Sequence, residues 1–434
     1  MYSYVAQMLK PILILVVIFS FAPAMAAGRM TLIYSANLDG ELEPCGCSDE
    51  GNLGGIKRRA SLLSHIREQD ASVVVVSAGG LLSAEGAGDQ LKSEYILKGF
   101  ATLDYDAIGL QWRDLAYGAE FVQQEKLPWV VSNWHDDSLS AARVIEKAGQ
   151  RIAFFTWLDP AASPLRKMQG SHALAQGSAA ELNKALAQAR QRGELTLLTT
   201  SLEAEDVAGL LDLAQVDILI ERSAYEVFAE PRRLGQTLVL KAGSRGMRLG
   251  RLDLEIADGR IDNWRHEVLP MPDTIADAPQ LSAWYEEYNA AVKADYLKVV
   301  EVRKAQRSGD SPFAGEEVCQ ACHVDKHKTW SASQHAIAYE DLEAVGKAFD
   351  PECIACHVVG FNQPGGFFDI NITGHLMGVQ CESCHGAGRD HAQSAGRKPV
   401  ANKKWAPQQM CAQCHVQKHS PGFDFGSYWP KIAH

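Results

Sequence analysis

Eight of the ten cysteines form four C-x-x-C pairs, and a histidine directly follows every pair. C-x-x-C-H is the pattern at which a c-type haem is attached covalently. Two thiols at this spacing can bond both haem vinyl groups, and the adjacent imidazole then meets the iron as its proximal ligand. The cysteines are Cys319, Cys322, Cys353, Cys356, Cys381, Cys384, Cys411 and Cys414, and the proximal histidines are His323, His357, His385 and His415. The sequence therefore predicts four covalently attached c-type haems, numbered first to fourth in chain order.

Two other kinds of site also use closely spaced cysteines. Pairs of C-x-x-C build structural zinc sites, and cysteines of exported proteins form disulfides. Neither kind of site explains the histidines. Because only 14 of 434 residues are histidine, a histidine would follow all four pairs by chance about once in a million such chains. We therefore prefer haem attachment.

Six further histidines lie in the same C-terminal stretch, which holds ten of the 14 in the chain: His327, His335, His375, His391, His419 and His434. A small domain with four haems needs up to four distal ligands. This surplus predicts that most irons have two imidazole ligands, although any single one of these histidines could instead be a surface residue. Two strong axial ligands leave no open position on the iron and favour electron transfer over substrate binding.

The stretches CHVDKHKTWSASQHAIAY and GVQCESCHGAGRDH resemble the cytochrome c554-type multihaem family. The shared elements are W-x-x-S-x-H and C-E-S-C-H-G-x-G, and the resemblance covers about 313–434. It implies a mainly α-helical multihaem domain. It also implies that His391 serves the first haem and His335 the third, while His419 or His434 serves the fourth. In that family the second haem can lack a distal ligand, and His375 is the residue that could fill this place.

From about residue 30 to 271, short apolar runs alternate with helical periods, which predicts an α/β layered core. The helical period at 179–193 is an example, and 248–271 reads as a hairpin with Asp-Gly at its turn. A long helix is expected over 281–306 as a connector. The strand-like runs are 30–36, 72–79, 105–110, 129–133, 151–158, 195–200, 216–220 and 237–243.

This N-terminal stretch resembles the 5′-nucleotidase-type metallophosphatase domain, through elements such as GGIKRRA, YDAIGLQWRDLAYG and LVLKAGSRGMRLGRLDLEI. The resemblance implies a four-layer β-sandwich with flanking helices. The family's two-metal site needs Asp, His and Asn at strand ends.

The sequence departs from that family at the metal ligands. The positions concerned are occupied by Asn37, Asp39, Gly80, Gln111, Trp112, Arg113, Asp114, Ser223 and Tyr225. The four histidines of 27–312 (His65, His135, His172 and His266) match no ligand position, and Arg113 and Arg222 would repel cations if they point inward. We expect a retained fold with a lost metal site, because fold alone does not carry function.

The remaining cysteines, Cys45 and Cys47, lie in EPCGCSDEGNLGG beside the expected position of that site. A strained disulfide or two structural thiols in a glycine-rich loop is one interpretation. A redox-active or sulfur-binding pair that exchanges electrons with the haems is another. Metal binding, or a bond to a partner, is a third.

The chain begins with the pattern of a signal peptide over 1–26, in which Lys10 and an apolar run precede a small-residue cleavage site. An uncleaved anchor is the alternative. No other long apolar run follows, so we expect no transmembrane segment after cleavage, and export to the periplasm or cell exterior of a bacterium. The net charge of −11 excludes the usual nucleic-acid-binding surface. The expected domains are 27–272 (metallophosphatase-like), 273–312 (helical connector) and 313–434 (tetrahaem cytochrome).

Two functions remain open from the sequence. The first is an electron carrier that exchanges electrons with donor and acceptor proteins and uses its N-terminal domain for docking or scaffolding. The second is an oxidoreductase that acts on a small nitrogen or sulfur compound at one five-coordinate haem. Phosphoesterase activity is not expected. Assembly into an extracellular haem wire is not decided by the sequence.

Overall fold

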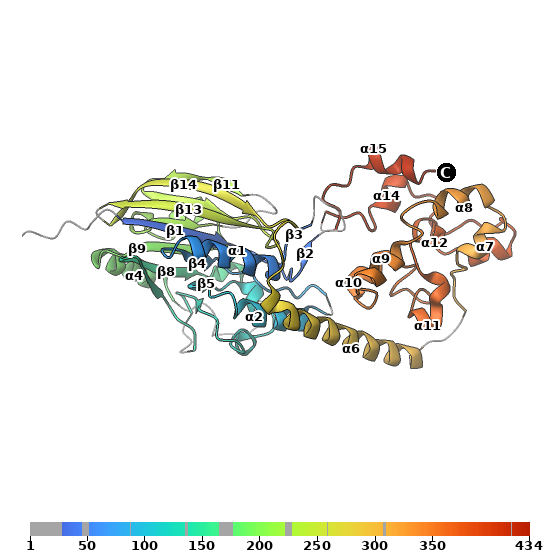
Figure 1. Ribbon diagram of the computed structural model, residues 1–434, viewed down its shortest axis with the longest axis horizontal. Coiled ribbons are helices and arrows are strands. Elements are labelled where there is room, and N and C mark those ends of the chain that lie inside the picture. The colour runs from blue at the N-terminus through green and yellow to red at the C-terminus, as the bar shows by residue number, and fades with distance from the viewer. Residues whose placement is uncertain are drawn as a thin grey trace, which may run out of the picture.

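The structure is a computed structural model that describes residues 28–45, 52–86, 88–134, 138–164, 177–221, 228–257, 259–306, 310–417 and 419–434. The predicted signal peptide lies outside these residues and stays a prediction. A β-rich N-terminal lobe and a helical C-terminal lobe lie side by side, and a long helix extends from the first to the second (Figure 1). In the described part of the chain, no helix combines the length and the apolar character that crossing a bilayer requires.

The first sheet has six strands in the order β14-β13-β1-β4-β5-β6. Its strands are β1 (Gly28–Ser35), β4 (Val74–Ser77), β5 (Ala107–Gly109), β6 (Trp129–Val130), β13 (Arg248–Ala257) and β14 (Arg260–Pro270). The four strands from β1 to β6 run parallel, and the hairpin β13–β14 joins them antiparallel to β1. This confirms the hairpin predicted at 248–271.

The second sheet has the order β11-β12-β10-β9-β8-β7. Its strands are β7 (Arg143–Lys147), β8 (Gln150–Trp157), β9 (Leu195–Thr200), β10 (Ile218–Ile220), β11 (Ala229–Leu234) and β12 (Thr237–Lys241). The sequence predicts the four central strands but not β7 and β11, which are the two edges. Edge strands need less apolar surface and tolerate charge and proline, as in AEPRRL of β11.

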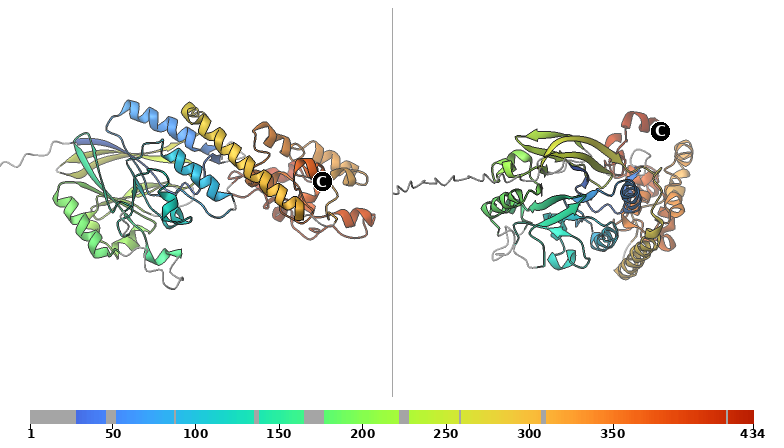
Figure 2. Two further views of the ribbon diagram at one scale, coloured as in Figure 1. Left: turned by 90° about the horizontal axis from the view of Figure 1, so that it is seen from below. Right: turned by 60° about the vertical axis from the view of Figure 1, so that its left-hand side comes forward.

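The two sheets pack face to face and helices cover both outer faces (Figures 1 and 2). Alternation along each strand separates the layers. In β1, Leu32 and Tyr34 face the other sheet, whereas Ile33 packs in the core under α1 (Ile56–Gln69) and α2 (Asp89–Phe100). In β8, Phe154 faces inward, and Phe155 packs in the core under α4 (Ala179–Gln191) and α5 (Ala204–Ala208). This confirms the predicted four-layer α/β sandwich and the helix expected at 179–193.

The N-terminal lobe also contains two smaller features. The strands β2 (Pro44–Cys45) and β3 (Leu53–Gly54) form a small two-stranded sheet. The one-turn helix α3 (Ala119–Val122) packs beside the loop at 111–115.

The predicted connector helix is present as α6 (Ser282–Gln306), and it belongs to the cores of both lobes. Near its start, Trp284 Nε1 donates to the carbonyl oxygen of Tyr95 at 3.0 Å, and Tyr288 is buried in the N-terminal core. Further along, Tyr296 and Val300 are buried in the C-terminal core. A single continuous helix that is anchored at both ends fixes the two lobes relative to each other.

The C-terminal lobe consists of short helices and turns, as expected for a mainly α-helical domain. They are α7 (Glu316–Gln320), α8 (Val324–Ser331), α9 (Ala338–Ala344), α10 (Pro351–His357), α11 (Ile370–Thr373), α12 (Cys381–His385), α13 (Arg389–Gln393), α14 (Pro407–Cys411) and α15 (Phe425–Tyr428). Its hydrophobic core has only ten buried residues, two of which belong to α6. A domain with so little core usually depends on disulfides, metals or another staple.

Candidate functional site

Each C-x-x-C-H motif lies on or directly after a single helical turn. In the first motif the N–H of His323 donates to the carbonyl oxygen of Cys319 at 3.0 Å, and the fourth motif repeats this bond between His415 and Cys411 at 2.9 Å. Residues three and four apart lie on the same side of a helix. The turn therefore presents both thiols and the imidazole on one side, as attachment of one haem requires.

Three pairs of imidazole rings lie beside one another, each joining a motif histidine to a spare histidine; one pair is stacked, one is tilted and one meets edge to face. The distances between ring centroids are 6.1 Å for His323–His391, 5.9 Å for His385–His434 and 6.2 Å for His335–His415. Bonds of about 2 Å from one metal to a ring nitrogen on either side would set the two centroids roughly 6 Å apart. The three centroid distances are therefore compatible with one metal ion held between the two rings of each pair.

Hydrogen bonds hold the far side of several of these rings. Nδ1 of His391 lies 2.7 Å from the carbonyl oxygen of Lys398, and Nδ1 of His434 lies 2.8 Å from that of Ile432. Nδ1 of His415 lies 3.1 Å from Ser420 Oγ. A histidine that donates its Nδ1–H in this way leaves Nε2 free for a metal, which is the usual arrangement of ligating histidines.

Burial also favours the neutral, metal-binding form of three of these imidazole rings. It lowers the pKa of His335, His385 and His415. A lowered pKa favours the neutral imidazole, which is the form that binds a metal.

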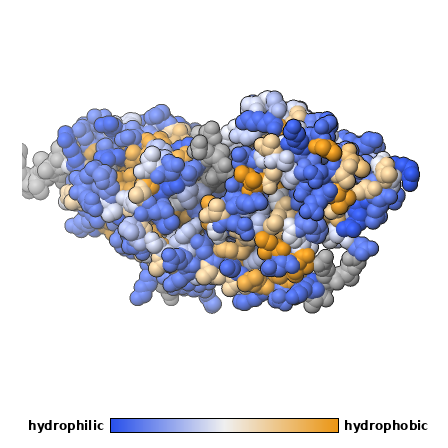
Figure 3. All heavy atoms as spheres, turned by 45° about the vertical axis from the view of Figure 1, so that its right-hand side comes forward, coloured by the Kyte–Doolittle hydropathy of each residue, from blue (hydrophilic) through white to orange (hydrophobic). Residues whose placement is uncertain are grey.

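The surface of the C-terminal lobe supports the same fit. Seven large apolar side chains are exposed there although the lobe is small: Val318, Val324, Ile337, Val345, Ile370, Trp405 and Val416. Figure 3 shows such hydrophobic residues in small patches among hydrophilic ones. Haem faces and edges are large and apolar, so side chains of this kind are suited to cover them. The residues of the lobe therefore fit c-type haem.

The distal histidines pair differently from the expectation in two of three cases. His391 lies against His323 of the first motif, as the resemblance implies. His335 does not meet His385 of the third motif; it lies against His415 of the fourth, and His434 takes the place beside His385. In the structure the ring of His335 thus lies beside the fourth motif and that of His434 beside the third, and which haem each histidine serves stays a prediction.

The other spare histidines have different surroundings. His327 Nε2 contacts the carboxylate of Glu316, and the His327 ring lies 5.1 Å from that of Trp330. The side chain of His375 is exposed. The backbone N–H of His419 donates to the carbonyl oxygen of Val416 in the turn after the fourth motif.

His357, the proximal candidate of the second motif, differs from the other three. Its Nδ1 contacts the carbonyl oxygen of Ala338. Among the ring contacts of the described residues, none joins His357 to a second imidazole. The exposed His375, which the sequence offered for this place, is not brought against it.

In the N-terminal lobe, the positions that the family resemblance assigns to metal-site loops bind one another. Gln111 Nε2 donates to Asn37 Oδ1 at 2.9 Å, and Arg113 forms an ion pair with Asp39. A Cβ atom on Gly80 would come within 2.6 Å of Asn37 Oδ1, so no side chain can return to that position without a shift. These described positions do not fit a two-metal centre. Arg222, Ser223 and Tyr225 lie outside the described residues.

The side chain of Asp114 joins the same group of loops through hydrogen bonds to their backbone. Its carboxylate is fully buried and accepts the backbone N–H groups of Gly80, Leu81, Leu82 and Gln111 at 2.6–3.2 Å. Burial raises the pKa of Asp114, and the four N–H groups oppose that rise. Sequence reasoning assigned this residue to a degenerate metal loop and missed its structural role.

Cys45 ends strand β2, two residues after Glu43, and Cys47 lies outside the described residues. The role of this pair therefore stays a prediction.

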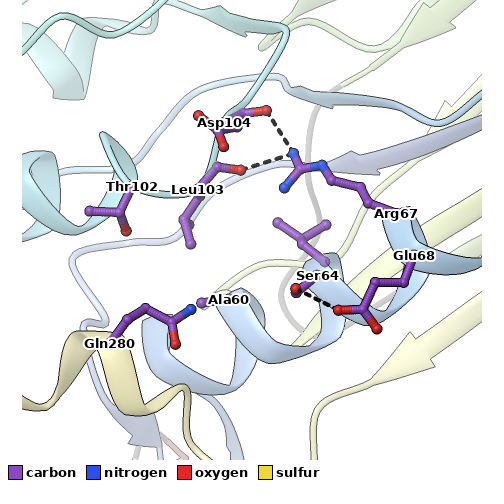
Figure 4. A pocket seen from close by; sticks show the side chains of 9 residues that line it. Ala60, Ser64, Arg67, Glu68, Thr102, Leu103, Asp104 and Gln280 are labelled. Carbon is purple, nitrogen blue, oxygen red and sulfur yellow. Dashed lines mark hydrogen bonds between the residues drawn. The ribbon is translucent and has the colours of Figure 1, made fainter. Parts of the chain in front are cut away.

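A cavity of about 350 Å³ lies beside α1, where it is lined by residues that include Arg67, Asp104 and Gln280 (Figure 4). Arg67 donates to the backbone carbonyl oxygens of Leu103 at 2.9 Å and Asp104 at 2.6 Å. Its guanidinium is thereby used in holding the loop, and none of the lining residues belongs to the predicted sites.

Comparison with known proteins agrees with the C-terminal geometry. A model of the family "Cytochrome c554 and c-prime" matches residues 318–386. Cytochrome c-554 of Nitrosomonas europaea is 35% identical over 140 residues, which are 25% of this chain and 60% of that protein. The chain thus spans 60% of the length of the curated relative that it matches. The match supports a c-type cytochrome with covalently bound haem.

The N-terminal lobe is similar to solved structures at low sequence identity. The 5′-nucleotidase precursor of Thermus thermophilus has a TM-score of 0.54 at 16% identity and covers 62% of this chain and 59% of its own. Sulfate thiohydrolase SoxB of the same organism has a TM-score of 0.53 at 16% identity, with 60% of each chain covered. Identity at this level shows the fold alone. The chain therefore joins a C-terminal region similar to the cytochrome c554 family to an N-terminal region with the 5′-nucleotidase fold.

Proposed function

We propose that this protein is an exported tetrahaem c-type cytochrome that transfers single electrons between donor and acceptor proteins. The observation that carries the proposal is the set of three adjacent imidazole pairs, each containing the histidine of a C-x-x-C-H motif. When bound, haem supplies one-electron redox chemistry whose potential depends on axial ligands and exposure.

The residues of the chain hold and space the four sites. The paired cysteines would fix each haem covalently, and the imidazoles would complete its axial coordination. The thiols of Cys319 and Cys381 lie close enough to interact, as do those of Cys356 and Cys414. The first motif therefore adjoins the third, and the second adjoins the fourth, which supports a continuous path for electrons through the lobe.

We further propose that the N-terminal lobe (27–272) is catalytically inactive as a phosphoesterase and acts as a docking or scaffold module. The mutual contacts of Asn37, Asp39, Gln111 and Arg113 support this proposal. The signal-peptide pattern predicted at 1–26 supports export. On this proposal Cys45 and Cys47 are candidates for a redox pair that exchanges electrons with the haems.

The ligand pairs can be tested in a protein that lacks the fourth haem, made by Cys411→Ser and Cys414→Ser. In this background His434→Ala should produce one additional high-spin haem, because His434 lies beside His385 of the third motif. His335→Ala should not, because its partner His415 belongs to the missing site. Electron paramagnetic resonance measures the change, with the exposed His375→Ala as control. The reverse pattern would support the pairing implied by the family resemblance and contradict the pairing proposed here.

A second function fits one observation, the lack of a facing imidazole at His357 in the described structure. An iron bound there on one side alone would keep an open position for a small nitrogen or sulfur compound. We expect carbon monoxide to bind one haem in four, which difference spectroscopy of the reduced protein would measure. Complete low-spin character with no binding would exclude this oxidoreductase function.

A further inference from the structure

The residue directly before the second haem motif contacts the N-terminal lobe. Lys92 of α2 forms an ion pair with Glu352 of α10, with 2.7 Å between Nζ and Oε2. Glu352 directly precedes Cys353, the first cysteine of the motif. In Figure 1, α9 and α10 lie on the side of the C-terminal lobe that faces β2, β3 and α6.

A second ion pair crosses the same boundary. Lys347 Nζ lies 2.8 Å from Glu43 Oε2, in the loop before β2, and 2.7 Å from Asn289 Oδ1 of α6. The Lys347 side chain is only 9% exposed, and its ammonium lies 5.1 Å from the ring centroid of Tyr285. Tyr285 in turn donates its hydroxyl to Glu43.

The lysines of these ion pairs are largely protected from solvent, whereas the Glu352 and Glu43 side chains are 37% and 28% exposed, so solvent screens these charges only in part. The Lys92 side chain is 13% exposed. Burial alone would lower its pKa, yet Glu352 raises that pKa well above its usual value, so Lys92 remains a cation. Glu43, which belongs to the other lobe, pairs with Lys347 six positions before Cys353, so its charge lies near the motif.

We propose that the N-terminal lobe sets the redox balance of the second haem through Lys92 and Glu43, as positioning residues outside its ligand shell. This inference rests on the proposed function. Reduction of ferric to ferrous iron adds one electron and removes one unit of positive charge from the site. A nearby cation therefore favours the ferrous state, and a nearby carboxylate favours the ferric state.

The two residues must then act in opposite directions. Lys92→Met removes a cation and leaves the carboxylate of Glu352 unbalanced beside the motif, which favours the ferric state and lowers the potential. Glu43→Gln removes an anion and leaves the ammonium of Lys347 unbalanced, which favours the ferrous state and raises the potential. Both variants keep the shape of the interface.

The test is a spectroelectrochemical titration of the full-length haem-loaded protein. In each variant one of the four redox steps should shift by about tenfold in its oxidised-to-reduced ratio, which is about 59 mV for a one-electron couple. The other three steps should stay in place. Lys98→Met and Glu94→Gln are matched controls, because this ion pair lies on the same helix α2 at 2.6 Å but has both partners in the N-terminal lobe.

Lys92→Arg keeps the cation and should restore the parental titration even if Lys92→Met loses stability. Four bound haems with no shifted step, with equal shifts of all steps, or with shifts of one sign in both variants would overturn this inference alone. Fewer than four covalent haems in the parent protein would overturn the proposed function itself, and this inference with it.

Discussion

Glu382→Ala is expected to destabilise the C-terminal lobe by about 4 kcal/mol. The substitution leaves three N–H groups without an acceptor, and each such group costs about 1–3 kcal/mol when it is buried. Glu382 is the second residue of the third motif, directly after Cys381, and is 5% exposed. Its carboxylate accepts the N–H groups of Ala314 and Gly315 at 2.9 Å and of Gly388 at 2.6 Å. It thereby ties the segment before the first motif to the third motif, so we expect lower occupancy of both haems.

Denaturant unfolding and the number of haems per chain measure these two effects. Glu382→Gln retains one carbonyl acceptor and should lose less stability than the alanine variant. Glu340→Ala replaces an exposed glutamate of α9 and should change stability by less than about 0.5 kcal/mol. If Glu382→Ala unfolded at the same denaturant concentration as Glu340→Ala, the bracing role of Glu382 would be refuted.

Asp114→Ala is expected to destabilise the N-terminal lobe by at least about 3 kcal/mol, because it leaves four buried N–H groups without an acceptor. Each carboxylate oxygen accepts two of these groups: Oδ1 those of Leu81 and Leu82, and Oδ2 those of Gly80 and Gln111. The haem content should be unaffected, since all four motifs belong to the other lobe.

Thermal unfolding followed by far-ultraviolet circular dichroism measures this loss. Asp114→Asn should also destabilise, because its NH₂ group cannot accept and would face two N–H donors. Glu120→Ala, an exposed change at the start of α3, is the control. Unaltered unfolding of Asp114→Ala would mean that these loops do not depend on the carboxylate.

The fold of the N-terminal lobe could be predicted where a buried segment has a recognisable apolar pattern in its own sequence. Buried central strands such as β4 and β10 consist almost wholly of apolar residues, so the sequence located them. The edge strands β7 and β11 pair on one side only, and their mixed composition carries no comparable signal. The connector helix could be predicted from the sequence because its helical pattern extends over many residues. Its packing into both hydrophobic cores could not, because it depends on contacts between segments that are distant in the chain.

The haem sites divide in the same way. The proximal residues follow from spacing alone, because one helical turn fixes the two thiols and the imidazole. The distal residues do not, since His335 meets a motif 80 positions away in the chain while His434 folds back beside His385. The order of residues along the chain does not reveal which histidines pair. It also does not reveal the ion pairs that Lys92 and Lys347 form between the lobes.

The loops that the family resemblance assigns to the metal site differ again. The sequence shows that Asn37, Gln111 and Arg113 stand where the family has metal ligands, but it does not show what these residues contact. The structure adds that these side chains bind Asp39 and one another, and that Asp114 became a brace for the loop at Gly80.

The central claim is that all four C-x-x-C-H motifs carry covalently bound haem. Mass spectrometry of the intact, denatured protein tests it most directly. We predict the mass of the polypeptide plus four haems, with a red pigment that acid acetone does not extract. A mass with fewer than four haems, or a pigment that washes out, would contradict this account.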